Sequence, residues 1–273
     1  MGFYWACSKN KRVLTMRNIV EKFSRQVILK RKLPKRFNSL PIYVSPESAL
    51  KFWFRNFEKR DPTLLKMVDE LVKPGEIVWD IGANVGVFSF AAAARAGKTG
   101  RVLSIEPDFF LLGLLNKSLS VQNDAEQEKA KVDILPVAIS DKTGIVKFNI
   151  AARSRSTNFL ENTEHGPETG GVRETISVMS VTLDWLLDYY PTPTVLKIDV
   201  ENSENLVFQG AMKLLREIRP VIFFESSPDN KERREVVAAI LKKNNYALYN
   251  AATEKDKRKP LDFPSYDTLA VPY

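Results

Sequence analysis

Hydrophobic and polar residues follow two recurrent patterns along most of the chain. Short apolar runs bounded by charged residues, glycine or proline predict buried strands at residues 77–79, 102–106, 131–139, 144–150, 175–181, 195–200, 221–225, 246–249 and 268–271. Apolar residues at helical spacing predict helices at residues 84–96, 109–123, 203–217 and 231–244. This order favours an α/β fold with a mostly parallel, doubly wound sheet that ends in an antiparallel hairpin. Polar residues 153–173 favour an inserted hairpin and loop.

The first 60 residues differ from the rest in charge. They contain 15 Lys and Arg against 3 Asp and Glu, a net charge of +12, whereas residues 61–273 have 26 against 30, or −4. Residues 18–37 and 46–72 have near-helical spacing, with Asp61 as the expected N-cap of a helix. We therefore expect residues 1–60 to be a basic, mostly helical extension. It is hypothesised to bind nucleic acid or an anionic membrane surface, or to lie as a docked arm on the main domain.

The length and composition exclude several classes of protein. A chain of 273 residues accommodates one large α/β domain with an extension. The single cysteine, Cys7, excludes an intramolecular disulfide framework and a cysteine-rich zinc site, which favours a reducing compartment. Apolar runs fall short of the roughly 20 residues of a membrane-spanning helix, and residues 1–12 lack a signal-peptide pattern. We expect a cytoplasmic protein without a transmembrane segment, and a peripheral position at a membrane surface is one hypothesis for the basic extension.

The strongest chemical signal is IVWDIGANVGVFSF at residues 77–90, followed by VLSIEPD at residues 102–108. Gly82 and Gly86 allow a tight turn and a close approach of the backbone to a ligand. The N–H groups at the start of the next helix can bind an anionic group such as a carboxylate. Glu106, at the end of the second strand, can accept hydrogen bonds from both hydroxyls of a ribose. Together these motifs predict a ligand that contains a nucleoside.

The spacing of the glycines favours one nucleoside cofactor over another. Dinucleotide sites usually carry the pattern G-x-G-x-x-G, which Ala83 and Asn84 interrupt here. The loop suits the amino-acid end of S-adenosylmethionine better than a pyrophosphate, so an NAD-dependent dehydrogenase is the weaker interpretation. The predicted cofactor-binding residues are Asp80, Gly82, Ala83, Asn84, Gly86, Glu106, Pro107 and Ala138.

Charged residues at the ends of two later strands are the candidates for chemistry. Period-two alternation places Lys197, Asp199 and Glu201 on one side of their strand. Transfer of a methyl group requires positioning and, where the acceptor is a hydroxyl, removal of a proton, for which Asp199 or Glu201 is the candidate base. Lys197 is expected to be protonated, as an orienting partner or as support for the developing alkoxide. Glu225, after the apolar residues 221–224, is expected to face the same cleft or to meet Lys197.

Other interpretations of this cluster stay open. The charges could form a structural ion-pair network at the end of the sheet. Asp199, Glu201 and Glu225 could offer oxygen ligands to Mg²⁺, although their spacing does not require a metal and none is favoured. His165 is the one histidine of the sequence and would act as a base only if the polar insertion folds over the site.

The motifs VWDIGANVGVFSF, IEPD, LPVAISDKTG, VTLDWLL, VLKIDVEN and VIFFES occur in the same order as in the FkbM family of S-adenosylmethionine-dependent methyltransferases, which residues 62–225 resemble. The resemblance implies a class I, Rossmann-like methyltransferase domain at residues 61–273 with a seven-stranded sheet. It also implies a hydroxylated acceptor such as a sugar, polyketide, glycan or other small metabolite. The residues that it places beside the acceptor pocket are Ser154, Ser156, Thr157 and Asn158.

One position departs from the family pattern. After the glutamate of KIDVE the family has glycine, a variable residue and glutamate, whereas this chain has Asn202, Ser203 and Glu204. The difference predicts an altered loop beside the reacting centre, and it motivates a non-catalytic cofactor-binding or scaffold protein as one alternative. A nucleic-acid methyltransferase that uses the basic extension is another, since it would need positive charge beside its cofactor cleft.

Overall fold

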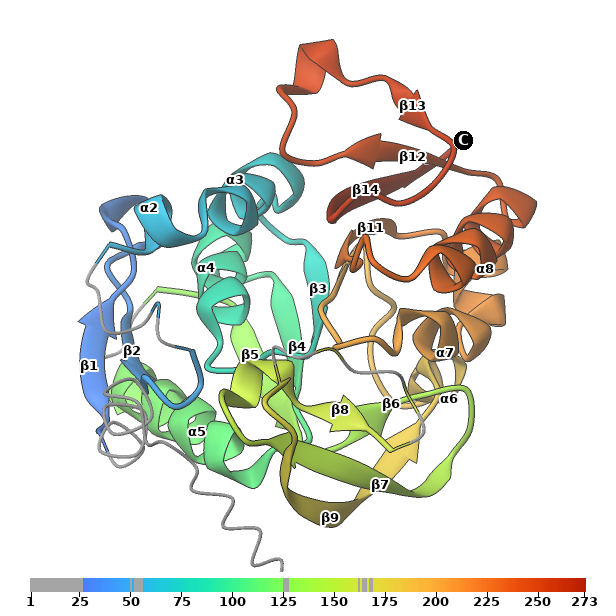
Figure 1. Cartoon of the computed structure of the whole chain (residues 1–273). Helices are drawn as coiled ribbons and strands as arrows, with labels where there is room; N and C mark the ends of the chain where they lie inside the picture. The colour runs from blue at the N-terminus through green and yellow to red at the C-terminus, as the bar shows by residue number, and fades with distance from the viewer. Residues whose placement is uncertain are drawn as a thin grey trace, which may run out of the picture.

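The computed structural model describes residues 27–49, 51, 56–124, 128–161, 163, 166 and 169–273. Its centre is an eight-stranded sheet (Figure 1). The strand order is β13 (Pro260–Leu261), β12 (Tyr246–Asn250), β14 (Asp267–Pro272), β11 (Val221–Glu225), β10 (Val195–Ile198), β3 (Ile77–Ile81), β4 (Arg101–Ile105) and β5 (Lys131–Leu135). The strands from β11 to β5 are parallel, and β14 runs antiparallel to β11 and β12. The sheet has eight strands instead of the expected seven, because the short β13 adds to its edge.

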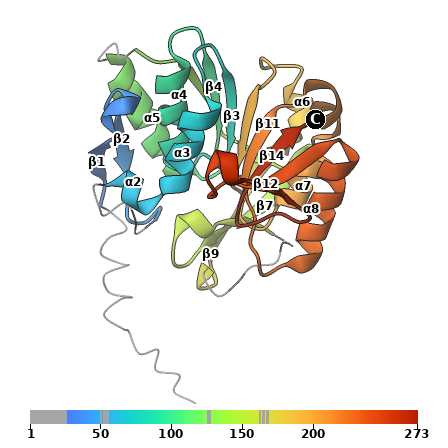
Figure 2. The same cartoon turned by 90° about the horizontal axis from the view of Figure 1, so that it is seen from above.

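Side-chain alternation along the strands divides the core into two layers, one on each face of the sheet. One face carries α3 (Pro62–Leu71), α4 (Val87–Ala96) and α5 (Phe109–Asp124). The other carries α6 (Leu183–Leu186), α7 (Glu204–Gln209), a π-helical turn (Leu214–Ile218) and α8 (Lys231–Lys243). Within β3, Val78 packs in the first layer and Trp79 in the second. Figures 1 and 2 show the sheet between these helices. Because the central strands are parallel, their carboxyl ends lie at the same edge of the sheet.

A second, four-stranded sheet lies beside this edge. Its order is β6 (Ala138–Ile139), β9 (Val172–Val181), β7 (Gly144–Ala151) and β8 (Phe159–Leu160). The strands expected at 144–150 and 175–181 are β7 and β9, and a 3-10 helix at Arg155–Thr157 precedes β8. The strand expected at 131–139 is divided between the two sheets as β5 and β6. The insertion is therefore part of a small sheet that also includes β6, rather than a hairpin and loop alone.

The helical prediction is wrong for the described residues before position 45. β1 (Leu29–Lys32) and β2 (Pro41–Val44) form an antiparallel ribbon, joined through a 3-10 turn at Lys35–Phe37. Pro34 and Pro41 explain the difference, because proline lacks the N–H that the interior of an α-helix requires.

The ribbon is anchored on the main domain through α5. Ile42 is fully buried in the same core layer as α4 and α5. The backbone N–H of Tyr43 donates to Ser118 Oγ at 2.8 Å, and Gln122 Nε2 donates to the carbonyl of Pro41 at 2.8 Å. The described part of the extension is therefore packed into the same body as the sheet.

Helix was also expected over residues 46–72, and among the described residues of this range α-helix is found from Phe57 onward. Residues 46–48 form a turn, whereas α2 (Phe57–Arg60) and α3 are helical, with Asp61 at the N-cap of α3. Residues 1–26 lie outside the described residues, so binding of nucleic acid or membrane through the extension stays a prediction. None of the helices in the described ranges combines the length and apolar character needed to span a bilayer.

Candidate active site

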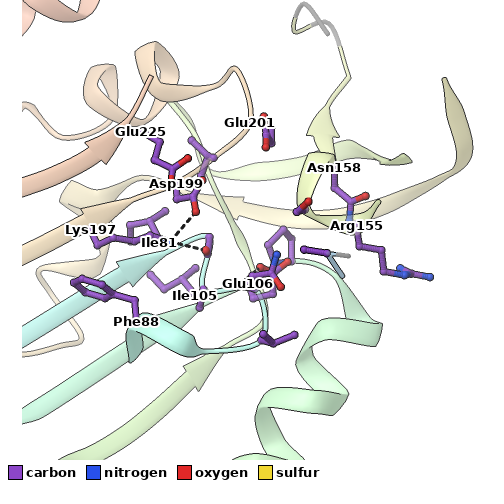
Figure 3. A pocket seen from close by; sticks show the side chains of 18 of the residues that line it. Ile81, Phe88, Ile105, Glu106, Arg155, Asn158, Lys197, Asp199, Glu201 and Glu225 are labelled. Carbon is purple, nitrogen blue, oxygen red and sulfur yellow. Dashed lines mark hydrogen bonds and ion pairs between the residues drawn. The ribbon is translucent and has the colours of Figure 1, made fainter. Parts of the chain in front are cut away.

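A cavity of about 390 Å³ lies at the carboxyl ends of β3, β4, β10 and β11 (Figure 3). Its volume is in the range of small-molecule sites. Doubly wound sheets bind their ligands at this edge. The residues labelled in Figure 3 are Ile81, Phe88, Ile105, Glu106, Arg155, Asn158, Lys197, Asp199, Glu201 and Glu225.

Six of the eight residues predicted to bind the cofactor line the cavity: Gly82, Ala83, Asn84, Glu106, Pro107 and Ala138. Asp80 and Gly86 lie behind its wall. Asp80 is fully buried and accepts a hydrogen bond from Ser89 Oγ at 2.5 Å, and Ser89 Oγ accepts one from Ser104 Oγ at 2.7 Å. Gly86 has a φ of 85° at the N-cap of α4. These two residues support the turn, and the structure gives them no exposed contact surface toward the cavity.

Gly82 is required by the packing of the protein itself. It has a φ of +73°, and a Cβ atom at this position would lie 1.9 Å from the carbonyl oxygen of Asp199. The N–H groups of Gly82 and Ala83 both donate to the carbonyl of Ile105 at 3.0 Å. The close approach expected toward a ligand is therefore a close approach to the neighbouring strand, and an anionic group would have to use N–H groups further along the turn.

Glu106 follows β4 and is fixed from both sides. Its Oε2 accepts from the N–H of Asn84 and its Oε1 from the N–H of Asp108, each at 2.9 Å. Only 5% of the residue is exposed, and burial raises the pKa of Glu106 to about 8. Each carboxyl oxygen can make a second hydrogen bond, so the group is oriented and still has capacity for ribose hydroxyls.

Lys197 lies beside Asp80 in the pairing of β10 with β3 and is 3% exposed. Its Nζ lies 2.9 Å from the carbonyl of Gly82, 3.1 Å from Asp80 Oδ1 and 3.3 Å from Asp199 Oδ2. Burial would lower the pKa of Lys197, but the charges of Asp199, Asp80 and Glu225 raise it above its ordinary value. One hydrogen bond and two ion pairs engage the ammonium group, which favours an orienting role over direct support of an alkoxide.

Three carboxylates reach the cavity beside Lys197: Asp199, Glu201 and Glu225 (Figure 3). The Asp199 side chain is 35% exposed. Glu225 is hydrogen-bonded to Tyr266, and the charge of Asp199 together with burial raises the pKa of Glu225 to about 8. Of the two arrangements expected for Glu225, the structure supports the one in which it faces the cleft.

The raised pKa of Glu225 predicts that stability depends on pH. Its ordinary value is 4.5, so between about pH 4.5 and 8 the folded protein holds a proton that the unfolded chain has released. The free energy of unfolding is expected to fall as pH rises through this window, and to fall less in Glu225→Gln. Urea unfolding of both proteins at about pH 5 and about pH 8.5 measures this difference. An equal fall in both proteins would contradict it.

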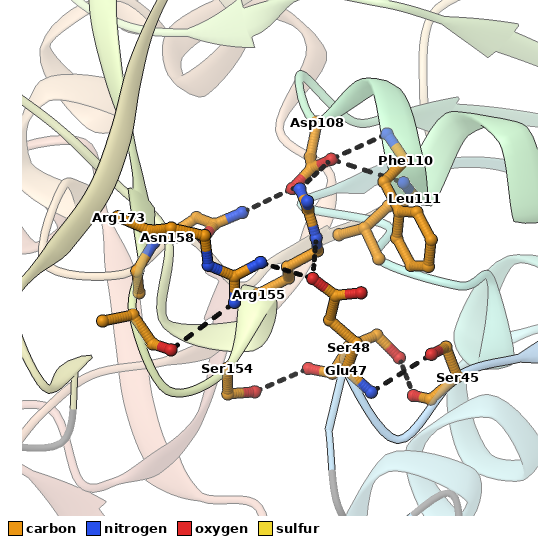
Figure 4. A network of polar contacts seen from close by, with 12 residues as sticks. Ser45, Glu47, Ser48, Asp108, Phe110, Leu111, Ser154, Arg155, Asn158 and Arg173 are labelled. Atoms are coloured by element: carbon orange, nitrogen blue, oxygen red, sulfur yellow. Dashed lines mark hydrogen bonds and ion pairs between the residues drawn. The ribbon is translucent and has the colours of Figure 1, made fainter. Parts of the chain in front are cut away.

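A polar network ties the insertion to the loop after β4 and to the N-terminal segment (Figure 4). Arg155 Nη1 donates to both carboxylate oxygens of Asp108, at 2.9 and 2.7 Å, and its Nε donates to Glu47 Oε1 at 3.0 Å. Asn158 Nδ2 also donates to Asp108, at 2.7 Å, and Arg173 also pairs with Glu47. Arg155 and Asn158 line the cavity, so the network fixes one of its walls. Apart from Asn158, these residues were not predicted, because no local pattern marks a contact between such distant positions.

The polar residues expected beside an acceptor have different positions. Ser156 and Asn158 line the cavity, and Thr157 lines an adjoining one. Ser154 is turned to the N-terminal segment, where its Oγ donates to the carbonyl of Ser48 at 2.7 Å. Three of the four residues can therefore contact a ligand, and the fourth supports them.

Asn202 stands where the family pattern has glycine, and its φ is +59°. Asparagine is one of the few residues with a side chain that adopts this left-handed conformation readily. Its Oδ1 accepts a hydrogen bond from Arg233 Nη1 at 2.5 Å, which further fixes the loop. The substitution thus retains a backbone conformation that glycine also adopts, and an altered loop beside the reacting centre stays a prediction.

The alternatives that involve a metal or histidine have separate outcomes. Across the described residues, no group of three or more His, Cys, Asp or Glu side chains is arranged to hold a metal ion. His165 lies outside the described residues, so its part in the chemistry stays a prediction.

The mixed sheet with helices on both faces, and a ligand cavity beyond the glycine turn of β3, define an α/β fold of the class I methyltransferase type. Residues 80–249 match the family described as the Methyltransferase FkbM domain. The match covers more than half of the chain, and the chain belongs to this family. The resemblance found in the sequence motifs is therefore confirmed.

Three proteins that match this chain are distant from it in sequence. Hexuronic acid methyltransferase AglP of Haloferax volcanii is 21% identical over 180 residues, which cover 64% of this chain and 66% of that protein. A solved methyltransferase FkbM from Methylobacillus flagellatus KT is 17% identical with a TM-score of 0.47, over 76% of this chain and 50% of that one. A solved SAM-dependent O-methyltransferase from Thermotoga maritima is 14% identical with a TM-score of 0.42, over 80% and 66%. The chain thus spans just under two thirds of the curated relative and half of the solved FkbM protein.

Proposed function

We propose that this chain is an S-adenosylmethionine-dependent O-methyltransferase that acts on a hydroxyl of a small metabolite, sugar or glycan. The observation that carries the proposal is the carboxylate of Asp199, which Lys197 holds at the wall of the cavity. A base at that place can take the proton that a hydroxyl loses when it is methylated. When bound, S-adenosylmethionine supplies a methyl group activated by a positively charged sulfur.

The residues around the cavity fit this cofactor. Glu106 offers oriented carboxyl oxygens to a ribose, and Ala138 and Ile139 offer an apolar surface to an adenine ring. The first turn of α4 offers N–H groups and partial positive charge to a carboxylate. Asp199 and Glu201 give the wall the negative charge that suits a sulfonium.

The proposed roles at the reacting centre follow from the contacts of each side chain. Asp199 accepts the proton of the acceptor hydroxyl. Lys197 orients Asp199 through their ion pair. Asp80 fixes Lys197 from the buried side. Glu225, with Tyr266, is proposed to position the acceptor, and Glu201 stays the alternative base.

A hydroxylated acceptor has support from two sides. The hydroxyl of Ser156 and the amide of Asn158 line the cavity, and such groups form hydrogen bonds with polyols. The curated relative is by its name a hexuronic acid methyltransferase, and hexuronic acids are sugars. At this low identity we carry over only the broad class of acceptor, and only as part of the proposal.

Calorimetric titration with S-adenosylhomocysteine tests the cofactor part of the proposal. Glu106→Ala is expected to weaken binding by about 1–3 kcal/mol, because it removes the acceptor of two ribose hydrogen bonds. Ile145→Ala is the matched control, since Ile145 is 67% exposed on β7 and does not line the cavity. Its affinity should equal that of the unmodified protein. Absence of binding, or a preference for NAD, would overturn the proposed function.

A further inference from the structure

A second cavity of about 670 Å³ adjoins the first. The two share Ser156, Asp199, Val200, Glu201, Glu225 and Tyr266 as lining residues. The second cavity therefore begins where the proposed base lies, which is where an acceptor must enter if the first cavity holds the cofactor. Its remaining described lining comes from the loops after β10 and β11, from the starts of α7 and α8, and from Thr157 and Gly166 of the insertion.

The described lining of the second cavity is strongly acidic. Its carboxylates are Asp199, Glu201, Glu204, Glu225 and Asp229. Arg233 is the one cationic side chain among its described lining residues, and it is engaged with Asn202 at 2.5 Å and with Glu204 at 4.0 Å. Lys197 pairs with Asp199 from behind the wall. The other acidic side chains outnumber Arg233, so the described lining has an excess of acidic over basic groups.

Two buried polar atoms in this wall have no hydrogen-bond partner among the described residues. Ser226 is 2% exposed, and its Oγ is unpaired. Glu204 is 3% exposed, and its Oε2 is likewise without a hydrogen bond. Buried polar groups in folded proteins are normally paired, so Ser226 Oγ marks a polar position in this wall without a partner among the described residues, whereas Glu204 Oε2 has the ion pair with Arg233.

We propose, on the basis of the proposed function, that the second cavity selects a hydroxylated acceptor that carries a protonated amine, such as an amino sugar, and disfavours a uronate. An ammonium group donates up to three hydrogen bonds, which suits a wall of carboxylates and an unpaired hydroxyl. A carboxylate on the acceptor would meet Asp199, Glu201 and Asp229 and would be repelled. The acceptor therefore differs in charge from the hexuronic acid named for the curated relative.

The raised pKa values of two carboxyl groups in the second cavity agree with a cationic acceptor. Burial raises the pKa of Glu204 to about 7, and the charge of Asp199 with burial raises that of Glu225 to about 8. Both directions mean that further negative charge in this space is unfavourable. A cation bound there would stabilise the ionised form of these carboxyls.

The test compares three hexoses that share a ring and differ in charge: glucosamine, glucose and glucuronate. Their dissociation constants are measured by calorimetry or ligand-observed NMR at neutral pH, with and without S-adenosylhomocysteine. We expect glucosamine to bind at least about tenfold more tightly than glucose, with glucuronate the weakest and the preference reduced by added salt. Equal affinities, tightest binding of glucuronate, or binding of none of the three would overturn the inference.

Charge-neutralising variants locate the effect. Asp229→Asn, on the exposed rim, and Glu204→Gln are each expected to reduce the preference for glucosamine by about threefold. Asp262→Asn is the control, since the Asp262 side chain is 90% exposed and lines neither cavity. Sugar binding is measured without turnover, so failure of the proposed function can be distinguished from failure of this inference. It would show as lack of S-adenosylhomocysteine binding or of methyl transfer, whatever the order of the three sugars.

Discussion

Asp199→Asn is expected to lower kcat for methyl transfer by about 10²–10⁴-fold, the range attributed to a positioned general base. Asparagine has nearly the same size as aspartate but cannot accept the proton of the acceptor. The affinity for S-adenosylhomocysteine should change little, because Glu106 and the turn after β3 are left intact. Steady-state turnover with labelled S-adenosylmethionine, beside calorimetry of the same protein, separates the two effects.

Glu201→Gln is the matched variant, since Glu201 lines the same cavity two residues further along. Its kcat should fall much less than that of Asp199→Asn if Asp199 is the base. A large loss in Glu201→Gln with near-normal turnover in Asp199→Asn would exchange the two roles. Near-normal turnover in both would remove general-base catalysis by this pair from the proposal.

Gly82→Ala is expected to destabilise the protein by more than about 3 kcal/mol or to prevent folding. The added Cβ would lie 1.9 Å from the carbonyl oxygen of Asp199, and a φ of +73° is itself unfavourable for alanine. The contacted atom belongs to the backbone, so no side chain can move away. Urea unfolding followed by circular dichroism, with the yield of folded protein, measures the effect.

Gly113→Ala provides the control for this experiment. Gly113 lies within α5, and a Cβ there would meet nothing within 4 Å. Alanine is favoured over glycine in a helix, so a gain of about 0.5–1 kcal/mol is expected. If Gly82→Ala were as stable as the unmodified protein, β3 and β10 could not approach each other as closely as described.

Local patterns in the sequence predicted the central part of the fold and much of the candidate site. Strand and helix periods located the parallel strands, and the loop after β3 was visible from Gly82 and Gly86. The alternation of Lys197 and Asp199 predicted the ion pair between them, whereas Glu201 lies in the turn after β10, which ends at Ile198. These features could be predicted because each depends on residues that are close in sequence.

Features that depend on distant pairings were missed. The network of Arg155, Asp108 and Glu47 joins three segments that no periodicity relates. The ribbon of β1 and β2 was taken for helix, because its apolar spacing fits both structures and its partner surface on α5 is distant in sequence. The contacts of Lys197 Nζ with the carbonyl of Gly82 and with Asp80 were also missed, because strand register sets the positions of these partners.

The position of β14 has a consequence for the order of folding. This strand lies between β11 and β12, although it follows both in the sequence. During synthesis, β12 therefore leaves the ribosome before the strand that connects it to the sheet. Until β14 emerges, β11 and β12 each have an edge without its partner strand, a state that favours aggregation. Chaperone dependence of this chain should accordingly be concentrated in the interval between the appearance of β12 and the insertion of β14.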